Sequence, residues 1–150
     1  MRKSITVSVA VLSIFGVSLA ISEVSSASTM GFLGHSSVAA DAGCFSDFLG
    51  SMLNSCAGIK RWQVTDTVNA GGNHSILVTA FRPNGGTVTC QACAATKEGF
   101  NNGCTASVPL NVVDTDSQFS VGTVNVPSFG GIVVFCDLSQ NAWYDSVNGF

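Results

Sequence analysis

Residues 74–95, HSILVTAFRPNGGTVTCQACAA, place two runs of β-branched and small apolar residues on either side of a Pro-Asn-Gly-Gly turn at 83–86. In the second run, Val88, Cys90 and Ala92 share one face of an extended chain. Proline presets φ and the Asn-Gly pair tolerates positive φ, so the turn predicts a hairpin connection between two strands. This stretch therefore indicates an all-β fold.

The same alternation recurs along the rest of the chain. Trp62 and Val64 alternate with polar neighbours in a strand that begins at Lys60, and Trp62 is predicted to be a core residue. Further strands are predicted over 106–113, 118–126, 131–138 and 142–147. Roughly seven short strands, with turn residues between them, predict an antiparallel β-sandwich. Between Cys44 and Leu53 the apolar residues instead follow helical spacing, which predicts a short N-terminal helical turn.

The N-terminus has the layout of a secretory signal peptide. Two basic residues at 2–3 precede an uncharged, mostly apolar run over 5–21, and Ser25-Ser26-Ala27 supplies small residues for cleavage. We expect residues 1–27 to be removed, with cleavage after Ala20 as the alternative. A retained anchor helix is less favoured, because about twenty apolar residues are needed to span a bilayer and serines interrupt this run.

The remaining chain has the size of one domain. Small polar residues over 28–43 predict a flexible lead-in, and 44–150 is predicted to form a single β-sandwich domain. Four basic residues against eight acidic ones leave a net charge of −4 after residue 27. Without a basic patch to neutralise phosphates, nucleic-acid binding is disfavoured. We expect no membrane contact after signal cleavage.

All six cysteines follow the predicted signal peptide. They are Cys44, Cys56, Cys90, Cys93, Cys104 and Cys136. An even number behind an export signal predicts a disulfide framework and a secreted protein, extracellular or periplasmic. Six cysteines allow fifteen pairings. Local spacing favours Cys44 with Cys56 and Cys93 with Cys104, which leaves Cys90 to meet Cys136 between strands.

Cys90-Gln91-Ala92-Cys93 also matches the CxxC pattern of redox and zinc sites. A redox pair needs its first thiolate at a helix N-terminus, whereas these residues lie in a predicted strand. A zinc site would enlist Cys104 and Cys136, which do not form a second close pair. We therefore expect structural disulfides, no metal and no cofactor.

His74 is the basis of a hydrolase hypothesis. Ser75 follows it, and Asp66 or Asp114 could complete a triad, but no serine lies in a nucleophile-elbow sequence. Residues 114–117 alternate oxygen-bearing side chains that could face calcium, although they lack the glycine and distant glutamate of an EF-hand loop. A surface histidine and a plain turn explain these features better.

Trp143 and Tyr144 are the leading binding candidates. Adjacent residues of a strand point to opposite faces, so one of the two rings is expected to be exposed. An exposed aromatic face can stack on a sugar ring, and Asn141 and Asp145 could add hydrogen bonds to its hydroxyls. A formal glycosylation sequon begins at Asn73.

Short motifs at 43–45, 54–56, 61–62, 83–87 and 134–137 read Gly-Cys-Phe, Asn-Ser-Cys, Arg-Trp, Pro-Asn-Gly-Gly-Thr and Val-Phe-Cys-Asp. In this layout the chain resembles small secreted Cys-patterned proteins encoded in Gram-negative genomes, which are generally of unknown function. The resemblance implies export and a β-domain, and it implies no activity.

Three functions remain open from the sequence. Few ionisable groups, a β pattern and a cysteine framework favour a non-catalytic protein with a structural, adhesive or surface-interaction role. A carbohydrate-binding module that uses the region of Trp143 and Tyr144 is the alternative, and a small secreted hydrolase is the third. The expected partner is a glycan or another cell-surface protein.

Overall fold

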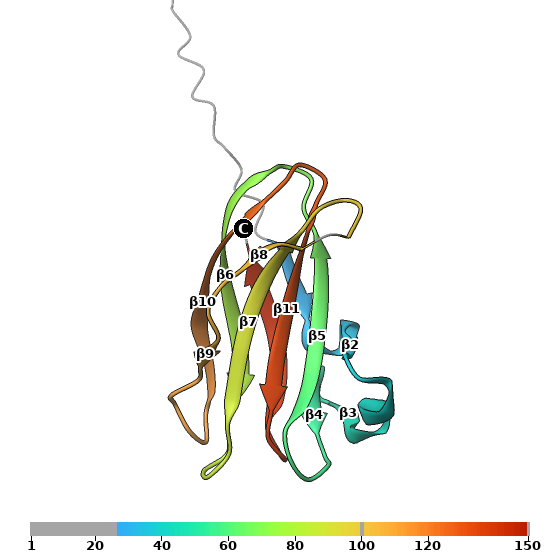
Figure 1. The fold of residues 1–150 in the computed structure, drawn as a ribbon. Coiled ribbons are helices and arrows are strands. Elements are labelled where there is room, and N and C mark those ends of the chain that lie inside the picture. Colours follow the sequence, from blue (N-terminus) through green and yellow to red (C-terminus); the bar gives the residue numbers. More distant parts are fainter. Residues whose placement is uncertain (1–26, 100, 150) are drawn as a thin grey trace, which may run out of the picture.

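A computed structural model describes residues 27–99 and 101–149. These residues form two antiparallel sheets packed face to face, with three disulfides (Figure 1), so the predicted all-β sandwich is confirmed. Two short 3-10 helices, η1 (Gly31–Leu33) and η2 (Ala39–Cys44), lie before the first hairpin. Within the described residues, no helix is long and apolar enough to cross a membrane.

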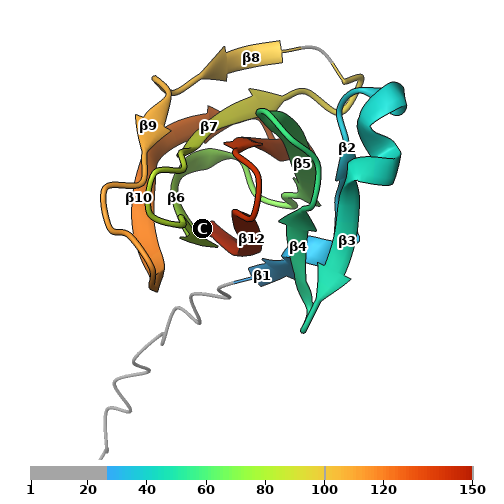
Figure 2. The same cartoon turned by 90° about the horizontal axis from the view of Figure 1, so that it is seen from below.

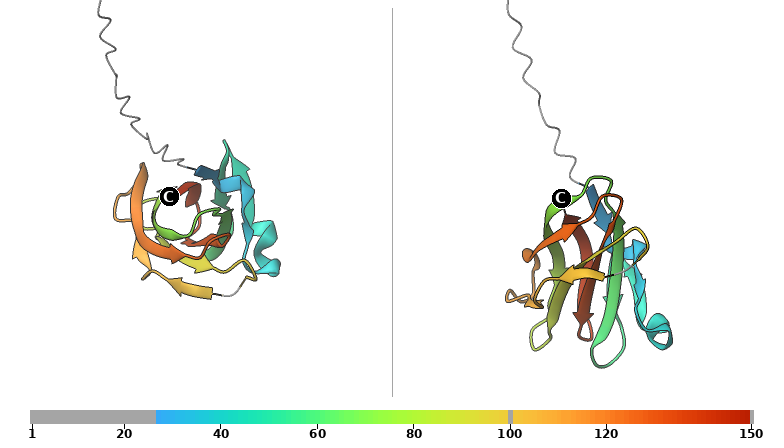
Figure 3. Two further views of the ribbon diagram at one scale, coloured as in Figure 1. Left: turned by 90° about the horizontal axis from the view of Figure 1, so that it is seen from above. Right: turned by 45° about the horizontal axis from the view of Figure 1, so that its top comes forward.

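Each sheet contains six strands. The first has the order β10 (Asp116–Val126), β6 (Gly72–Phe81), β12 (Trp143–Gly149), β4 (Ser51–Asn54) and β3 (Phe45–Phe48), and β1 (Ala27–Met30) also pairs with β12. The second has the order β2 (His35–Ser36), β5 (Lys60–Thr67), β11 (Gly131–Leu138), β7 (Val88–Ala95) and β8 (Asn101–Cys104), and β9 (Val108–Pro109) pairs with β7. On one side of the sandwich, β10 curves to lie beside β7 and β8 of the second sheet (Figures 2 and 3).

The core lies between the sheets and follows the period of two. Ile76, Val78 and Ala80 on β6 are fully buried, and alternate residues of β11 face them from the second sheet. Trp62 is only 6% exposed, as predicted. Such alternation is what one buried face per sheet requires.

The three disulfides pair as local spacing favoured. Cys44 bonds Cys56, Cys90 bonds Cys136, and Cys93 bonds Cys104. Both later bridges join residues that lie opposite one another on paired strands. Cys90 and Cys93 point to opposite faces of β7, so the CxxC pair does not bond to itself.

The predicted hairpin over 74–95 is wrong. β6 belongs to the first sheet and β7 to the second, so the turn at 83–86 carries the chain between the two layers. The turn itself is present, with Gly86 N donating to Pro83 O at 2.9 Å and Gly85 at a φ of 76°. Turn residues determine a local reversal, but they do not determine which strand the next one pairs with.

The predicted helical turn over Cys44–Leu53 is also wrong, because this segment is the β3–β4 hairpin. Its two-residue turn places Leu49 and Gly50 at φ values of 55° and 89°, the positive values that a tight hairpin needs. The Cys44–Cys56 bridge closes the open end of the hairpin. A short helical segment does occur, but it is η2, directly before Phe45.

Residues 28–43 are not the flexible lead-in that their composition predicted. β1 pairs with β12, and β2 pairs with β5. The Trp62 indole N–H donates to Gly31 O at 2.8 Å, and a Cβ on Gly31 would lie 2.3 Å from Tyr144 O. Glycine occurs at 31 and 34 because the backbone there packs directly against the sandwich.

The strands between 97 and 113 differ from those predicted. The predicted strand over 106–113 is reduced to the two residues of β9, with Leu110 buried beside it. β8 was not among the predicted strands, and Cys104 ties it to β7. The predicted signal peptide covers residues 1–27. Residues 1–26 lie outside the described part, and Ala27 begins β1.

Candidate functional site

Trp143 lies at the centre of an aromatic cluster on the outer face of the first sheet. It begins β12 directly opposite Phe81, the last residue of β6. The two rings are stacked, with centroids 3.7 Å apart and planes 4° from parallel. Phe48, from the edge strand β3, lies 5.4 Å from the Trp143 ring at a tilt of 47°. We refer to Phe48, Phe81 and Trp143 as the aromatic platform.

A hydrogen bond holds the indole in place. Trp143 Nε1 donates to Asp116 Oδ1 at 2.7 Å. Asp116 is the partner of Phe81 on β10, so this bond joins strands on both sides of β6, about 10 Å apart. The indole therefore reaches across Phe81, and one of its faces is covered by that ring. The other face is directed away from Phe81, and the side chain remains partly exposed.

Tyr144 does not lie on the outer face with Trp143. It points to the opposite face from Trp143, as neighbours on a strand should, and it is 1% exposed in the core. Its hydroxyl has no hydrogen-bond partner among the described residues. Burial in the core, with a smaller contribution from Asp145, raises the pKa of Tyr144 above its ordinary value. The ring is a core anchor.

The other two predicted site residues lie apart. Asp145 is half-buried on β12, and its Oδ1 accepts from Ser51 Oγ at 2.9 Å. Asn141 is exposed in the β11–β12 turn at a φ of 64°. It lines a pocket at the end of the sandwich and is not part of the aromatic platform.

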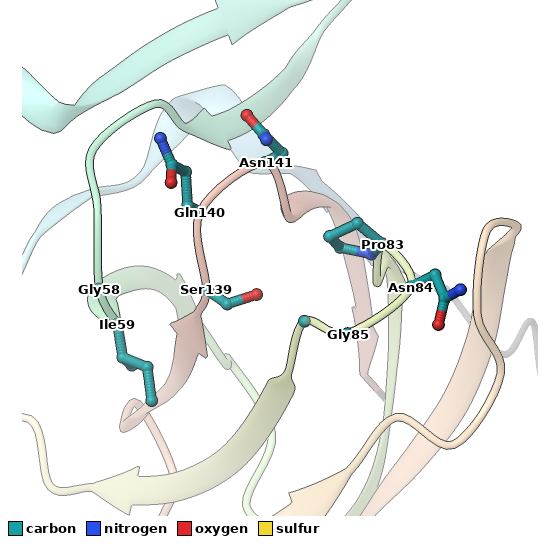
Figure 4. Close-up of a pocket in the computed structure, with 9 residues that line it drawn as sticks. Gly58, Ile59, Pro83, Asn84, Gly85, Ser139, Gln140 and Asn141 are labelled. Atoms are coloured by element: carbon teal, nitrogen blue, oxygen red, sulfur yellow. The ribbon is translucent and has the colours of Figure 1, made fainter.

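This pocket lies where three loops meet, at the opposite end from the last residues of β12 (Figures 1 and 4). It has a volume of about 330 Å³. The loops are β4–β5, β6–β7 and β11–β12. The residues that line it are Gly58, Ile59, Pro83, Asn84, Gly85, Gly86, Ser139, Gln140 and Asn141. We refer to it as the loop pocket.

Asn54 connects the loops that form this pocket. The side chain is completely buried, and its Nδ2 donates to Leu138 O at 2.9 Å and to Gly58 O at 3.1 Å. Its Oδ1 accepts from Cys56 N at 3.0 Å. The Asn54 carbonyl accepts from Asn141 N at 2.8 Å. One amide thereby holds the β4–β5 loop against the β11–β12 turn.

The β6–β7 loop, which forms the third wall of the pocket, is also held by hydrogen bonds. Thr87 N donates to Ser139 Oγ and Ser139 N donates to Thr87 O, both at 2.9 Å. Asn84 N donates to Asp114 Oδ1 at 2.8 Å, which fixes the β6–β7 loop to the segment just before β10. The pocket is therefore preformed by bonds among its own loops.

The described residues form neither a hydrolytic triad around His74 nor a cluster of metal ligands. Neither ring nitrogen of His74 has a hydrogen-bond partner in the described chain, so it forms no triad with Asp66 or Asp114. The Asp114 and Asp116 carboxylates accept hydrogen bonds from Asn84 and Trp143. Over 27–99 and 101–149, no three His, Cys, Asp or Glu side chains gather where they could hold a metal ion.

Phe81, Phe48 and Asp116 were not predicted as site residues. Their positions depend on strand pairing, since 62 residues separate Phe81 from Trp143 along the chain and only the sheet register places them opposite each other. A phenylalanine that ends a strand before a proline is a weak signal, and nothing local connects it to Trp143.

No protein-family model matches the sequence, and no curated protein matches it. Among solved structures, the Podospora anserina GH26-CBM35 β-(1,4)-mannanase matches with a TM-score of 0.55 and 9% identity, over 83% of this chain and 27% of that one. A ruminal GH26 endo-β-1,4-mannanase matches with a TM-score of 0.51 and 13% identity, over 83% and 25%. This chain thus spans about a quarter of the length of either mannanase.

A carbohydrate-binding module is matched over nearly its whole length. CBM6cm-2 from the Cellvibrio mixtus lichenase 5A, solved with cellotriose, gives a TM-score of 0.53 and 11% identity, over 82% of this chain and 95% of the module. At these identities, the similarity establishes the β-sandwich fold.

Proposed function

We propose that this chain is a non-catalytic carbohydrate-binding domain that holds a neutral glycan against the aromatic platform. The observation that carries the proposal is the position of Trp143, stacked on Phe81 and bonded to Asp116 with one face directed away from the stack. A ring fixed in this way loses little conformational freedom when a ligand binds, so less of the binding energy is lost to ordering.

The chemistry of the platform suits a sugar ring. A pyranose presents C–H groups on one face and hydroxyls around its rim. The Trp143 ring supplies a large apolar surface for that face. Asp116 and the exposed Gln118, two residues further on β10, supply hydrogen-bonding oxygen and nitrogen atoms beside it. The Asp116 carboxylate would repel an acidic sugar, which favours neutral glycans.

The solved structures support this function over a purely structural role. The module matched over 95% of its length was solved with cellotriose, and both mannanase chains are much longer than this chain. Beside a catalytic domain, a domain of this size would bring the enzyme to a glycan. On its own, it would attach a surface to a glycan. Surface interaction, the function favoured by composition, is compatible with this proposal.

We also propose that the domain works outside the cytoplasm. Three disulfides persist in oxidising compartments, and the described residues contain no free cysteine. Glycans of cell walls and cell surfaces are accessible there.

A glycan array tests the proposal. The purified domain should bind neutral oligosaccharides, and Trp143→Ala should reduce binding at least tenfold, which corresponds to about 1.4 kcal/mol. Phe129→Ala is the matched control, because Phe129 is a 70%-exposed aromatic side chain in the β10–β11 turn, after the opposite end of β10 from Asp116. Its binding should equal that of wild type. An array without any glycan bound, or equal loss in both variants, refutes the proposal.

A further inference from the structure

We infer that the loop pocket is a second sugar subsite, continuous with the aromatic platform, so that the domain binds two or more consecutive units of a neutral glycan. This inference rests on the proposed function. It assigns a ligand class to the pocket and a minimum length to the ligand.

The pocket lining selects an uncharged ligand rich in hydroxyls. Every described residue that lines it is uncharged. The amides of Asn84, Gln140 and Asn141 each offer donors and an acceptor, and Ser139 Oγ, which accepts from Thr87 N, retains its own proton to donate. Ile59 is 62% exposed and supplies an apolar wall. Alternating donors, acceptors and one apolar surface match the rim and face of a sugar.

The size of the pocket limits what it holds. Ligand pockets generally measure about 300–1,000 Å³, and this one, at about 330 Å³, is at the small end. A single sugar unit fits such a volume, whereas a longer glycan must extend beyond it. Its loops are held by Asn54 and Ser139, so the pocket is present before a ligand arrives.

The aromatic platform lies where the longer glycan would extend. Phe81 and Trp143 form the last facing pair of β6 and β12 before their loops. Pro83 lies two residues beyond Phe81, and Asn141 lies two residues before Trp143, so these two pocket residues are at most about 7 Å along the chain from the platform. That separation is comparable to the length of one sugar unit. A glycan stacked on Trp143 can therefore place its next unit in the pocket.

Two substitutions remove two of the three pocket amides without altering the backbone. Asn141 has a φ of 64°, a value that glycine adopts freely, so Asn141→Gly keeps the turn. The Asn84 backbone N–H bonds Asp114, and Asn84→Ala keeps that bond. Asn125→Ala is the control, because this exposed amide lies on β10 and bonds Asn73 outside the pocket.

The experiment is calorimetric titration with two series of probes, glucose to cellotriose and galactose to β-1,4-galactotriose. In at least one series, wild type should bind the trisaccharide at least tenfold more tightly than the monosaccharide. The Asn84→Ala/Asn141→Gly double variant should reduce that gain to under threefold. Asn125→Ala should keep the full gain.

The outcomes separate the two claims. If the double variant keeps the full gain in affinity from monosaccharide to trisaccharide, or if wild type shows no such gain, the pocket assignment is overturned. Either result leaves the proposed function intact. Loss of all binding in wild type overturns both. If the double variant fails to fold, ¹⁵N NMR of wild type decides, because trisaccharide should shift the amide signals of Gly58, Gly85 and Gly86 together with the indole N–H signal of Trp143. Trisaccharide that shifts the Trp143 signal and leaves these three amides in place overturns the inference.

Discussion

Asn54→Ala should destabilise this domain more than any other substitution of an asparagine in the described chain. The wild-type side chain is fully buried and makes three hydrogen bonds to backbone groups. Alanine leaves Leu138 O, Gly58 O and Cys56 N without that partner. A buried polar group that loses its partner costs about 1–3 kcal/mol.

The three groups do not contribute equally. Leu138 is completely buried, so its carbonyl should lose the full amount. Gly58 is exposed and Cys56 is half-buried, so water can replace part of what their groups lose. We therefore expect the free energy of unfolding to fall by about 3 kcal/mol. For a domain of this size, that corresponds to a decrease in Tm of about 10 °C.

Urea denaturation under non-reducing conditions, followed by the fluorescence of the buried Trp62, measures this change. Asn125→Ala is the matched control, since it makes the same substitution at an exposed amide, which bonds the Asn73 side chain. This control should lower the free energy of unfolding by less than about 0.5 kcal/mol. If Asn54→Ala and Asn125→Ala destabilise equally, Asn54 does not connect the loops of the pocket and the reasoning is wrong.

Three further predictions test the fold. Mass spectrometry of non-reduced peptides from protein produced in an oxidising compartment should recover three bridges; the pairs are Cys44–Cys56, Cys90–Cys136 and Cys93–Cys104. Any free thiol or a different pairing would contradict both the strand register and the proposed compartment. Gly31→Ala should lower the free energy of unfolding by about 2 kcal/mol, measured by thermal or urea unfolding, because the new Cβ would lie 2.3 Å from Tyr144 O. An unchanged free energy of unfolding would show that residues 28–43 are a loose lead-in after all. Tyr144→Phe should change the free energy of unfolding by less than about 0.5 kcal/mol, because the hydroxyl it removes has no partner among the described residues; a loss above about 1.5 kcal/mol would indicate a bond that this account lacks.

Local patterns predicted what depends on local chemistry. The alternation of Trp62 and Val64 placed Trp62 in the core, and the adjacency of Trp143 and Tyr144 placed their rings on opposite faces. Short spacing favoured the pairing of Cys44 with Cys56. Each of these inferences needs only the period of a strand or the length of a loop.

Features that depend on long-range pairing were not predictable. The turn at 83–86 is equally compatible with a hairpin and with a passage between sheets, and only the pairing of β6 with β10 and β12 decides. Apolar residues in a short hairpin can imitate helical spacing, as they do from Phe45 to Leu53. The aromatic platform requires Phe81 and Asp116 to lie beside Trp143, and that follows from register alone.

The central claim is that a glycan stacks on Trp143. The domain has two tryptophans, so ¹H–¹⁵N NMR shows two indole N–H signals, one from Trp143 bonded to Asp116 and one from Trp62 bonded to Gly31 O. Trp143→Phe assigns them. Titration with the tightest glycan from the array should shift the Trp143 signal progressively and leave the buried Trp62 signal in place. Saturating glycan that leaves the Trp143 signal unmoved would contradict the account.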